Sequence, residues 1–333
     1  MKGRVSGAGA VHRWFALAEE VLGQHCDRLN RLNVFPVPDS DTGTNMLASV
    51  RACRQALDGV RSEDIGELLA HAGSQAMYEA RGNSGTLLAV LVSGFAERLH
   101  GHRRLTVENL SEAMERGSLR AWSALSTPVP GTMLSIVDTA RECLSRHAGQ
   151  AHEPQSRAAL VTCFEDLVSQ CHQALVETEF QLPALRRAGV VDSGGSGLFL
   201  VLLALRATVM GHDDVNTSLL HELSGWEEDT RGSAPGEPRS ADEDDPGIGH
   251  SGVEVMATVR LDPLGGASLR HRLDEIGEAV IITPIDAQPD GAGFYRWRIH
   301  VHTADEPQVA DVVHEAGEVQ NYSASPLYWA QAE

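Results

Sequence analysis

The sequence is poor in basic residues. Its 333 residues include 27 Lys and Arg against 46 Asp and Glu, which gives a formal net charge of −19. A surface this acidic repels phosphate backbones, so nucleic acid is not expected as a partner. A single nucleotide is not excluded, because metal ions can lie between acidic side chains and phosphates.

Paired cysteines and long apolar runs are also missing. The five cysteines form no CxxC pair, and their odd number favours buried free thiols in a reducing compartment. No N-terminal stretch has the features of a signal peptide, and no run approaches the roughly 18 apolar residues of a membrane span. A cytoplasmic protein without a membrane span is therefore expected. The cysteines are Cys26, Cys53, Cys143, Cys163 and Cys171.

Residues 1–225 have the apolar periodicity of helices. Apolar residues recur at three- and four-residue spacing in several stretches, which predicts amphipathic helices packed as an antiparallel bundle. Ser62 is placed to cap the helix that begins near Ile65. The clearest stretches span residues 11–29, 65–72, 87–99, 160–175 and 198–205.

The composition changes after this region. Residues 226–249 are rich in Asp, Glu, Pro, Gly and Ser, so an acidic flexible linker is expected. Residues 250–333 then show period-two alternation at 253–261 and 294–303, a short apolar strand at 279–283, and a helix at 269–276. A second helix is expected to begin at Asp305, before Glu306 and Pro307. The fold class predicted is mainly α, followed by a smaller α+β domain.

Asp39 and Asp41 are the first candidates for chemistry. Two carboxylates two residues apart, braced by prolines, suit a hard cation such as magnesium, and Asn33 could add an oxygen ligand. The alternative is an Asx turn that only caps the next helix. The spacing does not fit a calcium EF-hand, because Gly43 falls one position early and no Glu closes the loop.

Three further loop segments precede or follow helical stretches. The loop at Gly82–Gly85 could hold phosphate through its backbone and Ser84, although no Gly-Lys-Ser/Thr follows as in a Walker loop. Thr132 and Asp192 stand at the start of helical runs. Each could line a ligand site or merely cap a helix.

His300 and His302 share one face of a strand, together with Arg296 and Arg298. This face could bind an anion or an acyl phosphate, or it could simply be solvated. Zinc is not expected here, because it needs more ligands and the second domain has no cysteine.

Read together, these segments resemble a known family. PVPDSDTGTNM, EARGNSGTLLAVLVSGF, TPVPGTMLSIVDTARE and AGVVDSGGSGL occur in the order found in the dihydroxyacetone kinase L-domain (DhaL) family. The resemblance covers residues 8–212 and looks nearest to the ATP-binding subunit of bacterial fatty acid kinase. The stretch RIHVHTADEPQVADVVHEAGEV resembles the middle domain of that subunit.

The resemblance implies an antiparallel helical barrel that binds ATP and two magnesium ions at one end. Asp39, Asp41 and Asn33 match its metal-binding positions, and one of His300 and His302 matches a histidine implicated in phosphotransfer. The positions that match nucleotide-binding residues are Thr42, Thr44, Asn45, Gly82, Asn83, Ser84, Thr132, Asp192 and Gly194.

The sequence departs from the family pattern at several positions. Ser40 replaces a usual glycine, which is a cost if its φ is positive, and Glu79 replaces another. Glu254 stands where some relatives have a zinc-binding cysteine, a second reason not to expect zinc. The kinase subunit normally continues into a lipid-binding domain, whereas this sequence ends at Glu333, so a fragment and a short form both stay open.

The function expected is transfer of the ATP γ-phosphate to a fatty acid carboxylate. The partner would be a fatty-acid-binding protein of the DegV-like type, and the family implies a homodimer. One alternative is a dihydroxyacetone-type small-molecule kinase subunit. Another is a non-catalytic module that senses nucleotide.

Overall fold

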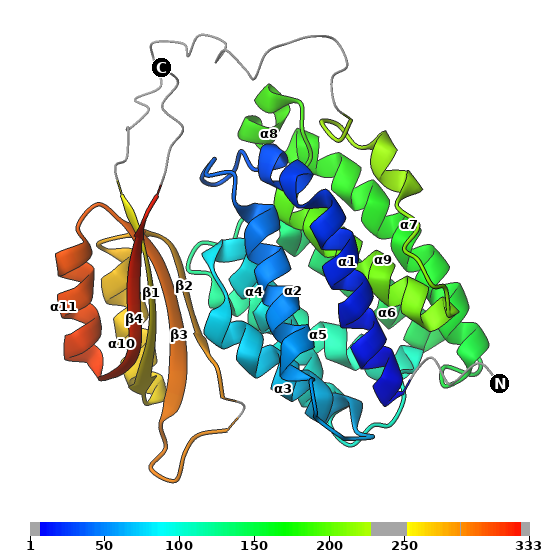
Figure 1. The fold of residues 1–333 in the computed structure, drawn as a ribbon, viewed down its shortest axis with the longest axis horizontal. Coiled ribbons are helices and arrows are strands. Elements are labelled where there is room, and N and C mark those ends of the chain that lie inside the picture. The colour runs from blue at the N-terminus through cyan, green and yellow to red at the C-terminus, as the bar shows by residue number, and fades with distance from the viewer. Residues whose placement is uncertain (1–6, 228–251, 287, 328–333) are drawn as a thin grey trace.

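The computed structural model describes residues 7–227, 252–286 and 288–327 of the 333-residue chain. The first stretch folds into a helical bundle, and the rest folds into a sheet covered by two helices on its outer face (Figure 1). The predicted fold class, mainly α followed by a smaller α+β domain, is confirmed. The predicted linker at 226–249 falls almost entirely outside the described residues.

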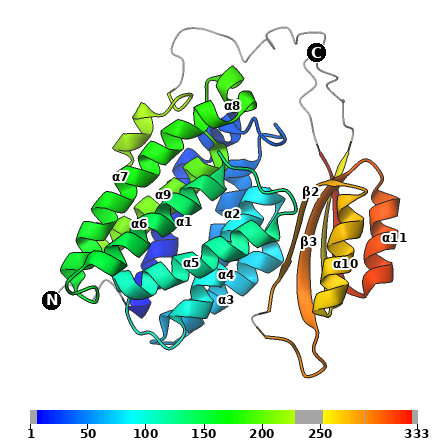
Figure 2. The ribbon, with the colours of Figure 1, turned by 180° about the vertical axis from the view of Figure 1, so that it is seen from behind.

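The bundle consists of long helices that run alternately up and down, as seen from behind in Figure 2. Their apolar faces meet in one continuous core, and the Cys53, Cys143, Cys163 and Cys171 thiols are free and buried, as expected. The helices are α1 (Ala8–Leu32), α2 (Thr42–Ala56), α3 (Ile65–Glu79), α4 (Gly82–Leu99), α5 (Val107–Ala124), α6 (Met133–Gln150), α7 (Arg157–Gln181), α8 (Pro183–Ala188), α9 (Ser193–Met210) and the 3-10 turn η1 (Ser218–Glu222).

Helix α9 is long and strongly apolar, and it is the one helix among the described residues that has both features to this degree. By length and mean composition it could cross a membrane, but Arg206 and its serines interrupt the apolar residues, so it does not contradict the expectation that no run approaches 18 apolar residues. In this fold 83% of the helix is buried among its neighbours, which accounts for its apolar composition.

The start of α3 differs from the prediction. Asp64, and not Ser62, is the N-cap, because its carboxylate accepts hydrogen bonds from the Gly66 and Glu67 amides. Ser62 lies two residues earlier. Its hydroxyl accepts from the Asp64 amide and donates to Glu67, so it supports the cap indirectly.

Four described strands form an antiparallel sheet in the order β2-β3-β1-β4. The elements are β1 (Val253–Leu261), α10 (Pro263–Asp274), β2 (Glu278–Pro284), β3 (Tyr295–Thr303), α11 (Glu306–Ala316) and β4 (Glu318–Pro326). This is the order of a split βαβ unit. As predicted, Asp305 is the N-cap of α11. Strand β4 was not predicted, since most of its side chains are exposed and it lacks an alternating apolar pattern.

The two faces of the sheet have different neighbours. One face is apolar, centred on Val255, Ile299 and Val301, and packs against α10 and α11. The opposite face carries Arg298 and His300, which are buried. This face is turned toward the bundle, so the interpretation of Arg298, His300 and His302 as a solvated face is wrong.

Hydrogen bonds between side chains and backbone groups, together with a β-bridge, join the sheet to the bundle. Arg298 Nη2 donates to the Ala80 carbonyl at 2.9 Å, and the Gly82 amide donates to Glu254 Oε1 at 2.9 Å. A β-bridge between Leu125 and Ile281 adds backbone pairing. The sheet and the bundle therefore meet at the start of α4 and just after the end of α5.

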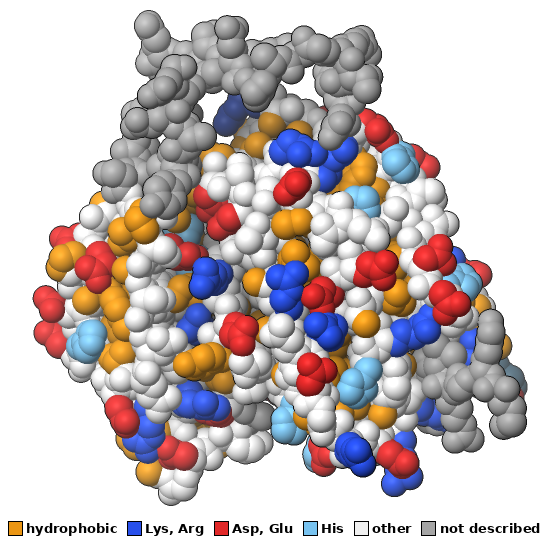
Figure 3. Space-filling model, viewed as in Figure 1, with side chains coloured by type: hydrophobic (Ala, Val, Ile, Leu, Met, Phe, Trp, Pro, Cys, Tyr) orange, Lys and Arg blue, Asp and Glu red, His pale blue; other side chains and the backbone are white. Residues whose placement is uncertain are grey.

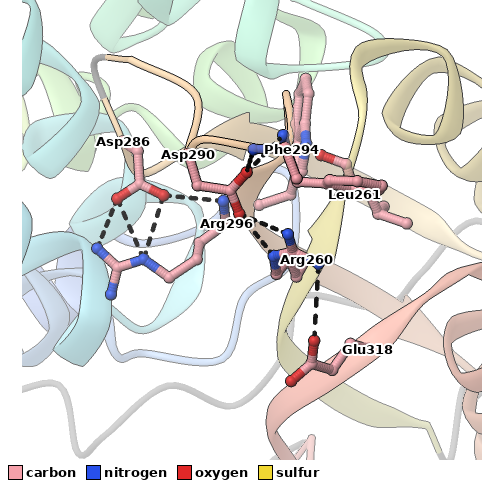
Figure 4. A network of polar contacts seen from close by, with 9 residues as sticks. Arg260, Leu261, Asp286, Asp290, Phe294, Arg296 and Glu318 are labelled. Atoms are coloured by element: carbon pink, nitrogen blue, oxygen red, sulfur yellow. Dashed lines mark hydrogen bonds and ion pairs between the residues drawn. The ribbon is translucent and has the colours of Figure 1, made fainter.

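Ion pairs stabilise the end of the sheet at which the chain passes from β2 to β3. Arg296 is paired with Asp286, and Arg260 with Asp290 and Glu318 (Figure 4). Arg260 also lies over the Phe294 ring at 4.3 Å. These contacts fix the β2–β3 connection within the sheet domain. Elsewhere on the surface, acidic and basic side chains are interspersed over the bundle (Figure 3).

Candidate functional site

A cavity of about 550 Å³ opens where the bundle meets the sheet. The N-terminal ends of α2, α4, α6 and α9 contribute to its wall, so free N–H groups and the positive ends of helix dipoles converge there. Such an arrangement favours an anion. The predicted site residues that line it are Asn33, Asp39, Asp41, Thr42, Gly82, Asn83, Ser84, Thr132, Asp192, Gly194 and His302.

Three predicted residues do not line the cavity. Thr44 points toward α1, where Asn30 both donates to its hydroxyl and accepts from its amide. This follows from helix geometry, because residues two apart lie on nearly opposite sides of a helix. Asn45 lies under Gly82, and His300 lies behind His302 with no exposed surface.

Asp39 and Asp41 form a close pair at the cavity wall, and their side chains share a hydrogen bond. Burial and the Asp41 charge raise the pKa of Asp39 to about 7, although a hydrogen bond from Asn33 Nδ2 opposes the shift. Burial also raises the pKa of Asp41. Asp41 occupies the N-cap position of α2, yet its side chain makes no capping bond. The alternative of a simple helix cap therefore does not account for this carboxylate.

These residues fit a hard divalent cation. Two carboxylates that each favour the neutral form lose that penalty when a cation lies between them. The Asn33 side chain orients Asp39, and the buried Asn83 Oδ1 at the cavity wall has no hydrogen-bond partner among the described residues. Unpaired buried polar atoms of this kind are expected where a polar ligand belongs.

The backbone near the carboxylates is strained. Ser40 has a φ of 56°, so the hydroxymethyl side chain carries the cost that a glycine would avoid. Ala279, which lines the sheet side of the cavity, has a φ of 54°. Glu79, the other departure, is an exposed residue at the end of α3 and shows no such strain.

The start of α4 approaches α2 closely. Gly82 has a φ of 58°, and a Cβ at this position would lie 2.3 Å from Asn45 Nδ2. Only glycine therefore lets the loop cross Asn45 and present its amide. That amide is occupied by Glu254 from β1.

Thr132 and Asp192 cap α6 and α9, as the simpler interpretation holds, and they also face the cavity. Asp192 is buried, which raises its pKa to about 7 even though the Gly195 and Met133 amides stabilise the charge. Its own amide donates to Thr178 Oγ1 of α7 at 2.9 Å.

Glu254, His300 and His302 form a cluster on the sheet side. Their ligand atoms lie within 4.8 Å of one another, so the three could hold a metal ion. His300 Nε2 is 3.0 Å from Glu254 Oε1, but without hydrogen-bond geometry, and both His300 ring nitrogens lack such a partner among the described residues. Although burial opposes it, His300 lowers the pKa of Glu254 to about 2. Burial and the charge of His300 lower the pKa of His302 to about 3.

The sequence did not indicate every residue of the wall. The cavity is also lined by Leu125, Ser126 and Thr127 after α5, and by Gly277 with the first three residues of β2. Neither segment carries a polar pattern that marks a site. Glu254 stood out only as a substitution, and its contact with Gly82 spans 172 residues.

A helical bundle whose cavity combines paired carboxylates with convergent helix N-termini has the features that suit a phosphorylated ligand held through metal ions. The profile of the DAK2 domain family matches residues 36–207, just over half of the chain, and the chain belongs to this family. The family expected from the sequence motifs is thereby confirmed.

Several proteins are similar to part or most of this chain. An uncharacterized protein of Staphylococcus epidermidis is 33% identical over 180 residues, 54% of this chain and 32% of that protein. Protein YloV of Bacillus subtilis is 26% identical over 302 residues, 90% of this chain and 51% of that protein. The chain thus spans about a third to a half of the length of these relatives. The crystal structure of dihydroxyacetone kinase from C. freundii in complex with AMP-PNP and Mg2+ covers 60% of this chain and 34% of that chain at 19% identity, with a TM-score of 0.45.

Proposed function

We propose that this chain is the nucleotide-binding part of a cytoplasmic phosphotransferase that uses ATP and magnesium. The acceptor in this proposal is a fatty acid carboxylate, presented by a separate fatty-acid-binding protein of the DegV-like type. The observation that carries the proposal is the Asp39–Asp41 pair, which is held with raised pKa values in a cavity walled by helix N-termini.

The bundle residues would bind and orient the donor. Asp39 and Asp41, with Asn33 beside them, would hold two magnesium ions, and the loop from Gly82 to Ser84 would place backbone amides against phosphate. Magnesium supplies neutralisation of the charge on the transferred phosphoryl group and on the leaving ADP. Thr132 and Asp192 shape the wall between α6 and α9.

The sheet would provide the acceptor side. His302 lines the cavity, and its low pKa keeps the imidazole neutral near pH 7, able to donate or accept one hydrogen bond. His300 lies behind it, where it would position Glu254 and His302. In the reaction the bond from the γ-phosphorus to the bridging oxygen breaks and a bond to the carboxylate oxygen forms. The products are ADP and an acyl phosphate.

Calorimetric titration with ATP, with and without magnesium, tests the donor half. The chain is expected to bind ATP only with magnesium, and Asp39→Asn/Asp41→Asn is expected to weaken binding on the order of 100-fold or more. Asp58→Asn, an exposed change beyond the opposite end of α2, is the control and leaves binding unchanged. Equal affinity with and without magnesium would contradict the proposal.

A transfer assay with the fatty-acid-binding partner separates the remaining candidates. Acyl phosphate formed only when the partner is present supports the fatty acid kinase. Phosphorylation of free dihydroxyacetone would support the small-molecule kinase, although that reading leaves the sheet wall of the cavity without a role. Binding of ATP with no transfer to any acceptor would instead identify a nucleotide-sensing module.

A further inference from the structure

A second cluster of metal-ligating side chains lies outside the cavity, between α6 and α7. Cys143 and His147 are one turn apart on α6, and Asp166 faces them from α7. Their ligand atoms all lie within 4.8 Å of one another. Cys143 is ten residues along α6 from Met133, so the cluster is about 15 Å along the helix from the cavity end.

The distances are those of a compact coordination shell. His147 Nε2 lies 2.9 Å from Asp166 Oδ2, and Cys143 Sγ lies 3.8 Å from the same oxygen. Ligands at about 2.0–2.3 Å from a tetrahedral ion are separated by about 3.3–3.8 Å. A small widening of the His147–Asp166 contact would therefore admit an ion.

Cys163, three residues before Asp166 on α7, is the candidate for a fourth ligand, although its thiol is not among the three ligand atoms that lie within 4.8 Å of one another. Its thiol hydrogen-bonds to that of Cys143, and this bond lowers the pKa of the Cys143 thiol while it and burial raise the pKa of the Cys163 thiol. Both thiols are buried, whereas the His147 and Asp166 side chains are 23% and 40% exposed. The cluster thus has a sulfur-lined inner side and an opening to solvent.

Neighbouring groups support the inner ligands. Gln170 Nε2 donates to Cys143 Sγ at 3.6 Å, and Arg146 Nη2 holds Gln170 through a 2.7 Å bond to its Oε1. Arg146 also lies 4.0 Å from Asp166. Two thiolates and one carboxylate exceed the charge of a divalent ion by one, and the Arg146 guanidinium balances the excess.

We propose that Cys143, His147 and Asp166, completed by Cys163, bind a zinc-type divalent cation. Thiolate and imidazole ligands select zinc or cobalt over magnesium, so this site and the carboxylate pair would take different metals. Binding displaces the proton shared by His147 and Asp166 and the thiol protons, so metal uptake releases protons.

The position of the ion gives it a structural effect on the cavity. It joins α6, which begins at the cavity with Met133, to α7, whose Thr178 hydroxyl holds the Asp192 amide. A bound ion therefore fixes two helices that support the wall, and it stabilises the folded chain by mass action.

Cobalt titration of the reduced, metal-free full-length chain tests the proposal. Thiolate-bound cobalt gives a near-ultraviolet charge-transfer band, and neither the carboxylate pair nor the Glu254 cluster contains sulfur to produce one. The expected result is a saturable band that excess zinc abolishes. In His147→Gln and Asp166→Asn, partly exposed changes that spare the core, the affinity should fall by on the order of 100-fold.

Two cysteine variants sharpen the test. Cys143→Ala should weaken the band and lower the affinity for cobalt, because only the Cys163 thiolate is then left in the cluster, whereas Cys171→Ala, equally buried but outside the cluster, should keep both at the wild-type value. Zinc should raise the melting temperature of the wild type and of Cys171→Ala, and not that of His147→Gln. No band in the wild type, or a band of unchanged intensity and affinity in both Cys143→Ala and His147→Gln, would overturn the proposal.

Discussion

Asp192 is an ionisable carboxyl buried at the N-terminus of α9. An unfolded Asp has a pKa of about 3.9, whereas the folded pKa of Asp192 is about 7. Between these values the folded state holds the proton more tightly, so the contribution of Asp192 to stability falls as pH rises from about 4 to about 7.

The variant Asp192→Asn isolates this effect. The amide keeps an oxygen acceptor for the Gly195 amide but cannot ionise. Relative to the wild type, the free energy of unfolding of the variant should rise through that window by at most about 4 kcal/mol, measured by urea unfolding without nucleotide or metal. Asp27→Asn, an exposed change, should give a curve parallel to the wild type. Parallel curves for Asp192→Asn would contradict the assignment.

At the scale of elements, α4 and α5 cross at two glycines. A Cβ on Gly94 would lie 2.6 Å from the Gly117 Cα, and a backbone atom cannot rotate away as a side chain can. The helices therefore owe their close approach to the absence of side chains at this crossing.

Gly94→Ala is expected to push α4 and α5 apart and destabilise the fold by about 1–3 kcal/mol. Gly23→Ala is the matched control, since Gly23 lies within α1 and a Cβ there meets nothing within 4 Å. The control should stabilise by about 0.5–1 kcal/mol, because alanine loses less backbone entropy in a helix. Denaturant midpoints of both variants check the prediction, and a neutral Gly94→Ala would refute it.

The elements also show how far the sequence could predict the structure. Apolar periodicity singled out α1, α3, α4, α7 and α9 but gave no stretch for α2, α5 or α6, and it missed β4 because an exposed edge strand has no buried face to mark. It also placed the α3 cap at Ser62, since local sequence does not say whether Ser62 or Asp64 reaches the free amides.

The part of the cavity wall that loop motifs form was predictable from the sequence. Asp39, Ser84 and Asp192 lie at helix starts that converge in an antiparallel bundle. The contacts of Glu254 and Arg298 with the α4 loop were not predictable, because they depend on how the sheet packs against the bundle. No local pattern encodes a contact across about 170–220 residues.

At the scale of the whole molecule, the buried Arg298 is a main attachment of the sheet to the bundle. Arg298→Ala would leave the Ala80 carbonyl without its charged donor, which costs about 1.5–3 kcal/mol. The segment from Ala80 to Gly85 should then exchange its amide hydrogens roughly 10–100-fold faster.

Arg296→Ala is the matched control for hydrogen exchange measured by mass spectrometry. Arg296 lies on the same strand, but its partner Asp286 belongs to the sheet domain (Figure 4). Exchange at Ala80 to Gly85 should stay at the wild-type rate in this variant. Equal exchange in Arg298→Ala and the wild type would show that the attachment lies elsewhere.

The carboxylate of Glu254 already occupies the first amide of α4. The chain therefore supplies its own competitor for an anion at this position, and a phosphate that reaches the Gly82 amide must trade places with Glu254. By thermodynamic reciprocity, a change that weakens the hydrogen bond between Glu254 and the Gly82 amide raises the affinity of the amide for phosphate. Phosphate binding at the amide weakens the attachment of β1 by the same free energy. Binding of an anion at the Gly82 amide and the hydrogen bond from this amide to Glu254 therefore exclude each other.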